Sequence, residues 1–356
     1  MNILHIAKIE QSCFKGVCVA VPSHILTQDK EANVAFININ NIKIPEIKNQ
    51  IPYLRPFKIE NVKSAWDTPD LVVFHEIYRI EFIQIKNELK KAGIPYIIIP
   101  HGAITKNAQK KSRFKKLVAN ALLFDSFIKD AFSIQFLSEQ EMVTSIGREK
   151  GFIGTNGINI PKKQKETFND DVIKLLFIGR IDVFYKGLDL LIEAVSEIKA
   201  FMEKHNVTLS LFGPDDDGGH KVIGEMIKKH SLSEIVTLGQ GISGEEKEKE
   251  LLNADIFIQT SRSEGMPTGI LEALSYGLPC IVTTGTTLGD KINEYDAGWV
   301  AEGDKYSIKE SIMRAVSEKE KLKSKSNSAR KLAESEFSWK KITFDTMKKY
   351  KEIVLR

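Results

Sequence analysis

The sequence predicts an α/β protein with two doubly wound domains, each built on a parallel sheet. Three observations support this fold class. The length of 356 residues suits two domains of ordinary size. Short apolar, β-branched segments alternate with longer helical patterns along the chain. A polar, lysine-rich segment at 161–171 interrupts this alternation, so we expect one domain at 1–160, a second at 161–338 and a final helical segment at 339–356.

The first domain is expected to alternate strands with helices from its first residues. Helical patterns occur between the strands, for example at 17–27 and 78–91. The expected strands, all short and apolar, are 2–7, 33–39, 71–75, 95–100, 134–137 and 151–154.

The second domain repeats the alternation and closes with helices at about 307–353. Its expected strands are 173–178, 207–212, 235–238, 255–260 and 279–283, and its expected helices are 187–203, 221–229, 245–253 and 267–276. In doubly wound folds, ligands bind outside the carboxyl ends of the strands. We therefore expect a cleft between the two sheets, and we searched the residues that follow strands for chemistry.

Composition is that of a globular protein, with 42% hydrophobic residues. No apolar run approaches the length of a membrane-spanning helix, and the N-terminal residues lack the apolar region of a signal peptide. We therefore expect a cytoplasmic protein. Cys13, Cys18 and Cys280 form no C-x-x-C pair, so we interpret them as reduced thiols, with Cys280 in the core.

Positive charge is concentrated in the first domain, where residues 1–160 hold 21 Lys and Arg against 15 Asp and Glu. Six of these cations lie close together, at Lys106, Lys110, Lys111, Arg113, Lys115 and Lys116. Phe114, Leu117 and Val118 are interleaved with them. A basic helix with an apolar stripe suits peripheral contact with an anionic membrane surface, and a solvated helix face is the open alternative. Nucleic acid is disfavoured, because no aromatic platform accompanies the cations.

The most informative segment lies between Glu264 and Glu272. It follows an apolar, buried-type strand at 255–260 and a turn at 261–266, and Pro267 occupies a favoured first helical position. A helix start offers unpaired backbone N–H groups, which bind anions. Glu272, one turn into the helix, suits a ribose hydroxyl pair, and Glu264 lies near whatever the phosphate carries. The arrangement suits a sugar nucleotide.

A second cation-rich loop opens the second domain, where Arg180 and Lys186 follow a buried strand that ends at Gly179. An Arg fork and a mobile Lys suit a diphosphate, and they stabilise the charge that grows on it when a glycosidic bond breaks. No metal is then needed. The acidic residues 215–217 invite a metal-binding interpretation, but they occupy a turn before a helix, where acidic residues cap.

His101 is the candidate from the first domain, because it follows a strand in the sequence Pro-His-Gly-Ala. His75 and Glu76 end the preceding strand and are either structural or on the acceptor side.

The stretch from Glu264 to Glu272 resembles the E-x7-E signature of family-4 retaining glycosyltransferases, which have the GT-B fold. The resemblance runs over about 172–300, and segments 69–76 and 95–116 look like capsule-type transferases. It implies transfer of a hexose-type sugar with retention, from a nucleoside-diphosphate donor, with UDP-sugar favoured and GDP-sugar possible. It further implies a saccharide or lipid-linked saccharide acceptor in surface polysaccharide synthesis, and a last helix that returns to the N-terminal domain.

The resemblance also implies roles for single residues. Arg180 and Lys186 hold the donor diphosphate, Glu264 orients the sugar, and Glu272 binds the ribose. His101 faces the donor sugar and completes the site when the domains close. The remaining implied donor contacts are Gly16 in the first loop, Gly239 and Gly241 beside the nucleobase, Gly213 lining the same cleft, and the amides around Met266, Pro267, Thr268 and Gly269.

Two other functions remain open on the sequence. A nucleotide-sugar 2-epimerase shares the fold but would not need the Arg180–Lys186 loop. A non-catalytic, transferase-like partner subunit could dispense with the two cations that this chain keeps. A glycoside hydrolase is disfavoured, because Glu264 and Glu272 do not flank a bond as an acid and a nucleophile would.

Overall fold

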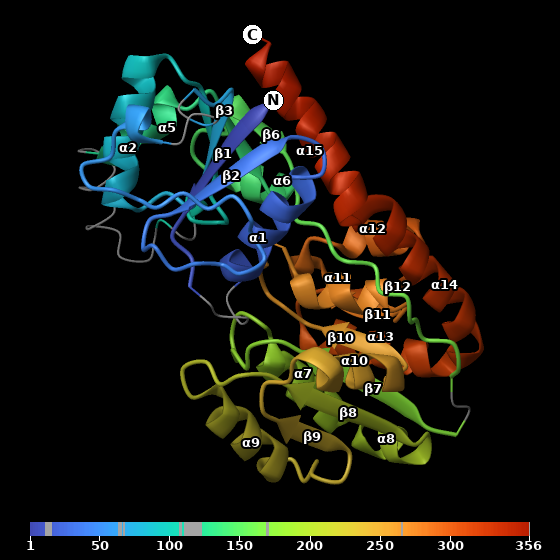
Figure 1. Cartoon of the computed structure of the whole chain (residues 1–356). Helices are drawn as coiled ribbons and strands as arrows, with labels where there is room; N and C mark the ends of the chain where they lie inside the picture. The colour runs from blue at the N-terminus through green and yellow to red at the C-terminus, as the bar shows by residue number, and fades with distance from the viewer. Residues whose placement is uncertain are drawn as a thin grey trace. The chain divides into compact units, whose positions relative to one another are not determined.

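The computed structural model describes residues 1–10, 16–62, 66, 68–106, 109, 123–168, 171–264 and 266–355, and the structural statements below concern these residues. The chain forms two compact units, which are described separately (Figure 1). Unit 1 comprises Met1–Gly157 with Trp339–Arg356, and unit 2 comprises Ile158–Ser338. Each unit contains one six-stranded sheet with parallel strand pairs, so the predicted fold class is confirmed.

The sheet of unit 1 has the strand order β2-β1-β3-β4-β5-β6. Its strands are β1 (Asn2–Ala7), β2 (Asn33–Asn38), β3 (Leu71–His75), β4 (Tyr96–Ile99), β5 (Ser133–Phe136) and β6 (Gly151–Ile153). Every neighbouring pair is parallel. After β2 the chain returns to β3 on the other side of β1. The topological switch point of this sheet therefore lies between β1 and β3.

Helices cover both faces of this sheet. They are α1 (Gly16–Gln28), α2 (Ile80–Ala92), α5 (Asp125–Asp130), α6 (Glu139–Thr144) and α15 (Trp339–Val354). One face packs an apolar core that includes Phe74, Phe82 and Phe127. Since side chains alternate between the faces of a strand, His5 and His75 point to the other face. That face carries α1 and α15, which pack against each other, so the last helix of the chain belongs to unit 1.

The sheet of unit 2 has the order β12-β11-β10-β7-β8-β9. Its strands are β7 (Ile173–Ile178), β8 (Val207–Phe212), β9 (Val236–Gly239), β10 (Ile256–Gln259), β11 (Cys280–Thr283) and β12 (Gly298–Ala301). From β7 the chain proceeds outward to β9, then returns to β10 on the other side of β7 and proceeds outward to β12. The topological switch point therefore lies between β7 and β10.

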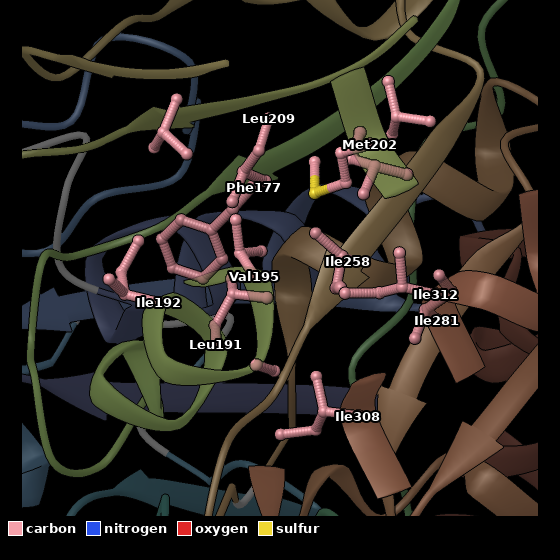
Figure 2. Close-up of a cluster of buried hydrophobic side chains, with 14 of the residues drawn as sticks. Phe177, Leu191, Ile192, Val195, Met202, Leu209, Ile258, Ile281, Ile308 and Ile312 are labelled. Carbon is pink, nitrogen blue, oxygen red and sulfur yellow. The ribbon is translucent and has the colours of Figure 1, made fainter. Parts of the chain in front are cut away.

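Two apolar cores sandwich this sheet. Figure 2 shows part of one core, in which Phe177, Leu209 and Ile258 from the strands meet Leu191 and Ile312 from helices. The other core includes Cys280, so its predicted place in the core is confirmed. The helices of unit 2 are α7 (Leu188–Glu197), α8 (Lys199–Lys204), α9 (Gly219–Lys229), α10 (Gly244–Asn253), α11 (Thr268–Ser275), α12 (Gly289–Glu294), α13 (Lys305–Ser317) and α14 (Leu322–Leu332).

Three differences between the sequence-based elements and the structure are informative. The expected helix 187–203 is two helices that meet at Ile198. Pro267 precedes α11 as its N-cap instead of opening the helix. Strand β12 was not predicted, because it is short and begins with glycine. That glycine is required by packing, since a Cβ at Gly298 would lie 1.9 Å from the Cys280 carbonyl oxygen.

Some predictions fall on residues outside the described ranges. These are most of the first loop at 11–15, which includes Cys13, and all of the basic segment 106–116 except Lys106 and Gln109. The membrane contact assigned to that segment therefore stays a prediction. No helix within the described ranges is long and apolar enough to cross a membrane.

A substitution at Gly213 tests the close packing between the ends of β7 and β8. A Cβ at Gly213 would lie 1.6 Å from the Gly179 carbonyl oxygen, so the backbone must move to admit one. We expect Gly213→Ala to lower the free energy of unfolding by about 1–3 kcal/mol or more, as overpacking does. Chemical denaturation measures the loss.

Gly224→Ala is the matched control, because a Cβ at Gly224 meets nothing within 4 Å and the residue lies inside α9. We expect this variant to keep or raise stability by roughly 0.5–1 kcal/mol, the usual gain from alanine in a helix. Equal stability of the two variants would contradict the packing argument.

Candidate functional site

The candidate site of unit 2 lies at the switch point, where the loops after β7 and β10 leave the carboxyl ends of adjacent strands. Arg180 and Lys186 belong to the first of these loops, and Glu264 belongs to the second. Gly187, with φ 63°, ends the first loop and allows close contact with the second. A Cβ at Gly187 would lie 2.0 Å from the Thr260 carbonyl oxygen, so only glycine fits there.

Lys186 and Glu264 form an ion pair between the two loops. Lys186 Nζ lies 2.5 Å from Glu264 Oε1, and each side chain is only 14% exposed. Oε1 also accepts hydrogen bonds from Gln259 Nε2 at 3.0 Å and Ser261 Oγ at 2.8 Å. All three donors therefore converge on one carboxylate oxygen. Among the described residues nothing bonds Oε2, so the Glu264 carboxylate is held firmly and keeps one oxygen available for a ligand.

Arg262 joins the same two loops. Its guanidinium forms two hydrogen bonds with the Asp189 carboxylate, at 2.7 and 2.8 Å, and donates to the Phe184 carbonyl at 2.8 Å. It also lies over the Phe184 ring, 4.6 Å from the centroid. The hydrogen bonds that Arg262 donates to Asp189 raise the pKa of Arg262. Arg262 thus holds the loop that carries Glu264 against the loop that carries Lys186.

Arg180 lies apart from the Lys186–Glu264 pair in its contacts. Its side chain is 54% exposed and forms an ion pair with Asp216, with Asp182 at 3.9 Å. Asp215 accepts hydrogen bonds from the backbone N–H groups of Gly218 and His220, where α9 starts. Within the described ranges no group of three or more His, Cys, Asp or Glu is arranged to hold a metal ion. The expectation that no metal is needed stays a prediction.

Glycines line the carboxyl ends of β7, β8 and β9. Ile178 pairs with Phe212, which pairs with Gly239, so the three strands end level with one another. A Cβ at Gly239 would lie 2.5 Å from the Phe212 ring, and one at Gly241 would lie 3.1 Å from the Pro214 nitrogen. Gly213 is buried, and its carbonyl accepts a hydrogen bond from His220 Nε2 at 2.9 Å.

The start of α11 differs from the expectation for its amides. Pro267 has no N–H group, and the N–H of Thr268 already bonds the Met266 carbonyl at 3.0 Å. Neither residue therefore offers a free amide to a phosphate, which corrects the prediction for these two positions. Gly269 is needed for packing, because a Cβ there would lie 2.9 Å from the Ile178 carbonyl oxygen.

Glu272 lies within α11 and forms an ion pair with Lys247 of α10. Both side chains are about three-quarters buried, at 27% and 26% exposure. The pair involves Glu272 Oε2, and among the described residues no hydrogen bond engages Oε1. Lys247 was not predicted, because nothing in the charged sequence of α10 distinguishes it from its neighbours.

In unit 1, His101 follows β4 in a tight turn. Its φ of 49° is unusual for a residue other than glycine, and Gly102 follows with φ 81°. The buried Glu141 carboxylate fixes this turn, because it accepts hydrogen bonds from the N–H of Gly102 at 2.5 Å and of Leu137 at 2.7 Å. Burial raises the pKa of Glu141, and these two bonds partly offset the rise. The role of His101 at a donor sugar stays a prediction.

His101 belongs to a buried cluster of histidines. His5 Nδ1 lies 2.9 Å from His75 Nε2, and His75 Nδ1 lies 3.1 Å from His101 Nε2. Burial lowers the pKa of His5 and of His101 to about 3, and it lowers that of His75 well below 6.5. The side chain of His75 is fully buried, so it does not itself touch a ligand, and the acceptor-side role that was one of the two possibilities for His75 and Glu76 stays a prediction. Glu76 forms an ion pair with Arg79 at 2.7 Å.

Sequence reasoning missed several residues that shape these sites, although two of them gave a signal. Gln259 and His5 each interrupt an apolar strand, and a polar residue in a buried strand indicates a hydrogen-bonded role. Ser261 gave none, although its partners Gln259 and Glu264 are near in the sequence. Arg262 and Glu141 gave none, since Asp189 and Gly102 are distant from them in the sequence.

The part of the chain that forms most of unit 2 matches a known protein family. Residues 159–332 match the family model described as Glycosyl transferases group 1. The chain is 28% identical over 203 residues to the uncharacterized glycosyltransferase MJ1607 of Methanocaldococcus jannaschii, which covers 54% of this chain and 50% of that protein. The chain spans half or less of the length of the curated relatives that it matches.

Solved structures share the fold over nearly the whole chain. Anabaena Alr3699/HepE in complex with UDP superposes with a TM-score of 0.75 at 14% identity, over 99% of this chain and 100% of that one. The same protein in complex with UDP-glucose gives 0.72. WaaG, a glycosyltransferase involved in lipopolysaccharide biosynthesis, gives 0.63 at 15% identity, over 99% of each chain.

Arg262→Lys should loosen the two loops at the switch point. Lysine cannot make the paired hydrogen bonds to Asp189 or stack on Phe184, so we expect the free energy of unfolding to fall by about 1–2 kcal/mol. The control is Arg314→Lys, whose side chain is 67% exposed and pairs with Glu318, and whose effect should stay within about 0.5 kcal/mol. Urea denaturation compares them, and equal losses would contradict the role given to Arg262.

The buried histidines predict acid sensitivity. His24, against His75 and Trp339, also has its pKa lowered by burial, to about 4. Because the unfolded chain binds these protons near pH 6.5 and the folded chain does not, stability is complete above pH 6.5 and is lost as the pH falls toward the folded pKa values. Each histidine contributes up to about 1.4 kcal/mol per pH unit.

His24→Gln tests this dependence, because glutamine does not titrate and can still donate to Asn156, the partner of His24. Between pH 6 and 4.5, we expect its free energy of unfolding to fall less steeply than that of the parent chain. The difference in slope should approach that of one bound proton, about 1.4 kcal/mol per pH unit. Parallel curves would contradict the assignment of His24 as neutral in the folded state.

Proposed function

Residues 159–332 form a glycosyl transferases group 1 domain, and from that premise we propose that the chain is a retaining glycosyltransferase that moves a hexose-type sugar from a nucleoside-diphosphate donor. The observation that carries the proposal is the ion pair between Lys186 and Glu264 at the switch point of unit 2. It places a cation and a carboxylate with a free oxygen where ligands bind in doubly wound folds.

The donor diphosphate binds Lys186 and Arg180. Lys186 is largely buried, so its charge acts through a medium of lower dielectric constant than water and stabilises a neighbouring phosphate more strongly. Arg180 is exposed and held by Asp216, and its guanidinium exchanges that carboxylate for a phosphate oxygen. Negative charge grows on the β-phosphate as the sugar departs, so both cations favour the transition state over the ground state.

The two glutamates bind the neutral parts of the donor. Oε2 of Glu264, which no described residue engages, accepts a hydrogen bond from a hydroxyl group of the sugar. Glu272 accepts from the ribose hydroxyls, and Lys247 orients it by pairing with the other oxygen. Backbone groups near Gly239 and Gly241 contact the nucleobase. We favour a UDP-sugar, because a protein of the same fold binds UDP and UDP-glucose; a GDP-sugar is the second candidate.

Transfer proceeds on one face of the sugar. The oxygen of the acceptor hydroxyl bonds to the anomeric carbon while the bond from that carbon to the β-phosphate oxygen breaks. The hydroxyl proton passes to the departing phosphate oxygen, so the anomeric configuration is retained and the protein supplies no nucleophile. The chemistry needs no metal, since Lys186 and Arg180 carry the compensating charge.

The proposed acceptor is a saccharide or lipid-linked saccharide in surface polysaccharide synthesis. The support is the fold shared with WaaG, which acts in lipopolysaccharide biosynthesis. A basic segment at 106–116 suits the anionic surface at which a lipid-linked acceptor resides.

A thermal-shift series with UDP-glucose, UDP-galactose, GDP-mannose and ADP-glucose tests the donor. The cognate donor should raise the melting temperature, since a ligand present at 100 times its dissociation constant adds about 2.7 kcal/mol of stability. Glu272→Gln should lower the affinity for that nucleotide sugar by roughly 10- to 100-fold, because a hydrogen bond to a charged group is lost.

The rate of turnover of the cognate nucleotide sugar tests the role proposed for Lys186. Lys186→Met should reduce release of the nucleoside diphosphate by roughly 100- to 1,000-fold. The control is Lys174→Met in β7, where the lysine bonds Asn253 at the other end of the strand. If no nucleotide sugar binds, the proposal fails. Conversion of a UDP-sugar to an epimer without an acceptor would favour an epimerase instead.

A further inference from the structure

Three histidines form a hydrogen-bonded row across the carboxyl ends of β1, β3 and β4. His5 pairs with Val73 in the sheet register, and His75 lies two residues further along β3. His75 pairs with Ile99, and His101 lies two residues beyond it. A shift of two residues returns a side chain to the same face of a sheet, so His5 and His75 lie on one face, and His101, in the turn after β4, continues the row through its contact with His75.

The direction of the hydrogen bonds in this row can be derived from the buried residues beyond His5. Gln135 Nε2 donates to the Gly154 carbonyl at 2.7 Å. A backbone carbonyl only accepts, so the orientation of the Gln135 amide is settled, and its Oε1 accepts from the Tyr350 hydroxyl at 2.7 Å. Tyr350 is therefore a donor toward Gln135, and its remaining lone pairs can only accept.

Gln28 lies beside Tyr350 and ends the row at His5. Within the described chain, Gln28 Nε2 has no hydrogen-bond partner, so the contact that orients the amide is the one that its oxygen makes with His5. Gln28 Oε1 lies 3.0 Å from His5 Nε2, which must therefore carry the proton.

The rest of the row follows from one proton per ring. Burial lowers the pKa of each histidine, so all three are neutral near pH 7. His5 uses its proton at Nε2, so its Nδ1 accepts from His75 Nε2. His75 Nδ1 in turn accepts from His101 Nε2. His101 is left with a bare Nδ1, and no partner for that atom occurs among the described residues.

We propose that Gln28, His5 and His75 are positioning residues that hold His101 in its Nε2–H tautomer, so that its Nδ1 accepts a hydrogen bond from a hydroxyl group of a saccharide bound at unit 1. The identity of the ligand rests on the proposed function. The tautomer does not, since it follows from hydrogen bonds inside unit 1. His101 thus recognises a hydroxyl hydrogen and does not donate a proton to the leaving group.

Two features of the turn fit this role. His101 is partly exposed, whereas His5 and His75 are fully buried. Its backbone is held in an unfavourable conformation by the Glu141 carboxylate, and such conformations persist where the surroundings enforce them, often at functional sites. The row also replaces apolar core with polar groups that need partners, which is costly unless each is satisfied.

Proton-detected nitrogen NMR of the full chain, with labelled histidine rings, tests the proposal. The chain has seven histidines, and single substitutions assign them. In the wild type we expect His5, His75 and His101 to be neutral Nε2–H tautomers from pH 8 to 5.5. A protonated Nδ1 on His101, or a charged ring, overturns the proposal.

Variants along the row should move this signature in a set order. Gln28→Leu removes the terminal acceptor and should give His101 a mixture of both tautomers. Gln28→Glu keeps an oxygen beside His5 and should restore the Nε2–H form. His24→Gln is the matched control, because His24 is buried beside His75 but bonds Asn156, and it should leave His101 unchanged. An unaltered His101 in Gln28→Leu overturns the assignment of Gln28.

Activity provides the second readout. With the cognate nucleotide sugar, His75→Phe should lower kcat/KM by roughly 10- to 100-fold, as loss of an orienting partner of a functional histidine does, while donor binding through unit 2 persists. If no nucleotide sugar binds the wild type, the proposed function fails and the tautomer result stands. If the donor turns over but His101 is an Nδ1–H tautomer, this inference alone fails.

Discussion

The ion pair between Lys186 and Glu264 is the interaction on which the candidate site of unit 2 depends. Both charges are largely buried, and a buried charge is tolerated only when it has a partner and hydrogen bonds. The pair therefore constrains the two loops that carry it, and Arg262 adds a second charged connection through Asp189. Where strands diverge at a switch point, such links keep the loops in contact.

The pair also explains how one site can serve two kinds of group. Three donors converge on Glu264 Oε1, which orients the carboxylate, and no described residue bonds Oε2. Lys186 is held in place by the same pair. Under the proposed function, the diphosphate meets a cation that is already positioned, which reduces the reorganisation that charge stabilisation costs.

Both units place polar side chains in strands that would otherwise be apolar. In unit 2, Gln259 ends β10 beside Ser261 and Glu264. In unit 1, His5 lies within β1 and His75 ends β3, at the point where that sheet reverses its strand order. Most of these polar groups bond one another, so their burial costs less than it would singly. Such networks orient the residue at their exposed end, which here is Glu264 or His101.

The sequence alone determined the fold class and most strands, because apolar period and β-branched composition report on local burial. It also indicated Lys186, Glu264, Glu272 and His101, since each follows or flanks a strand or helix end where chemistry is expected. It could not find Lys247, Arg262 or Glu141, whose roles arise from partners on other elements. It also could not show that the N–H of Thr268 bonds the Met266 carbonyl, or that Arg180 forms an ion pair with Asp216. Those facts depend on which loops the sheet order brings together, and only the tertiary structure decides that, because contacts between residues distant in the chain leave no local period to detect.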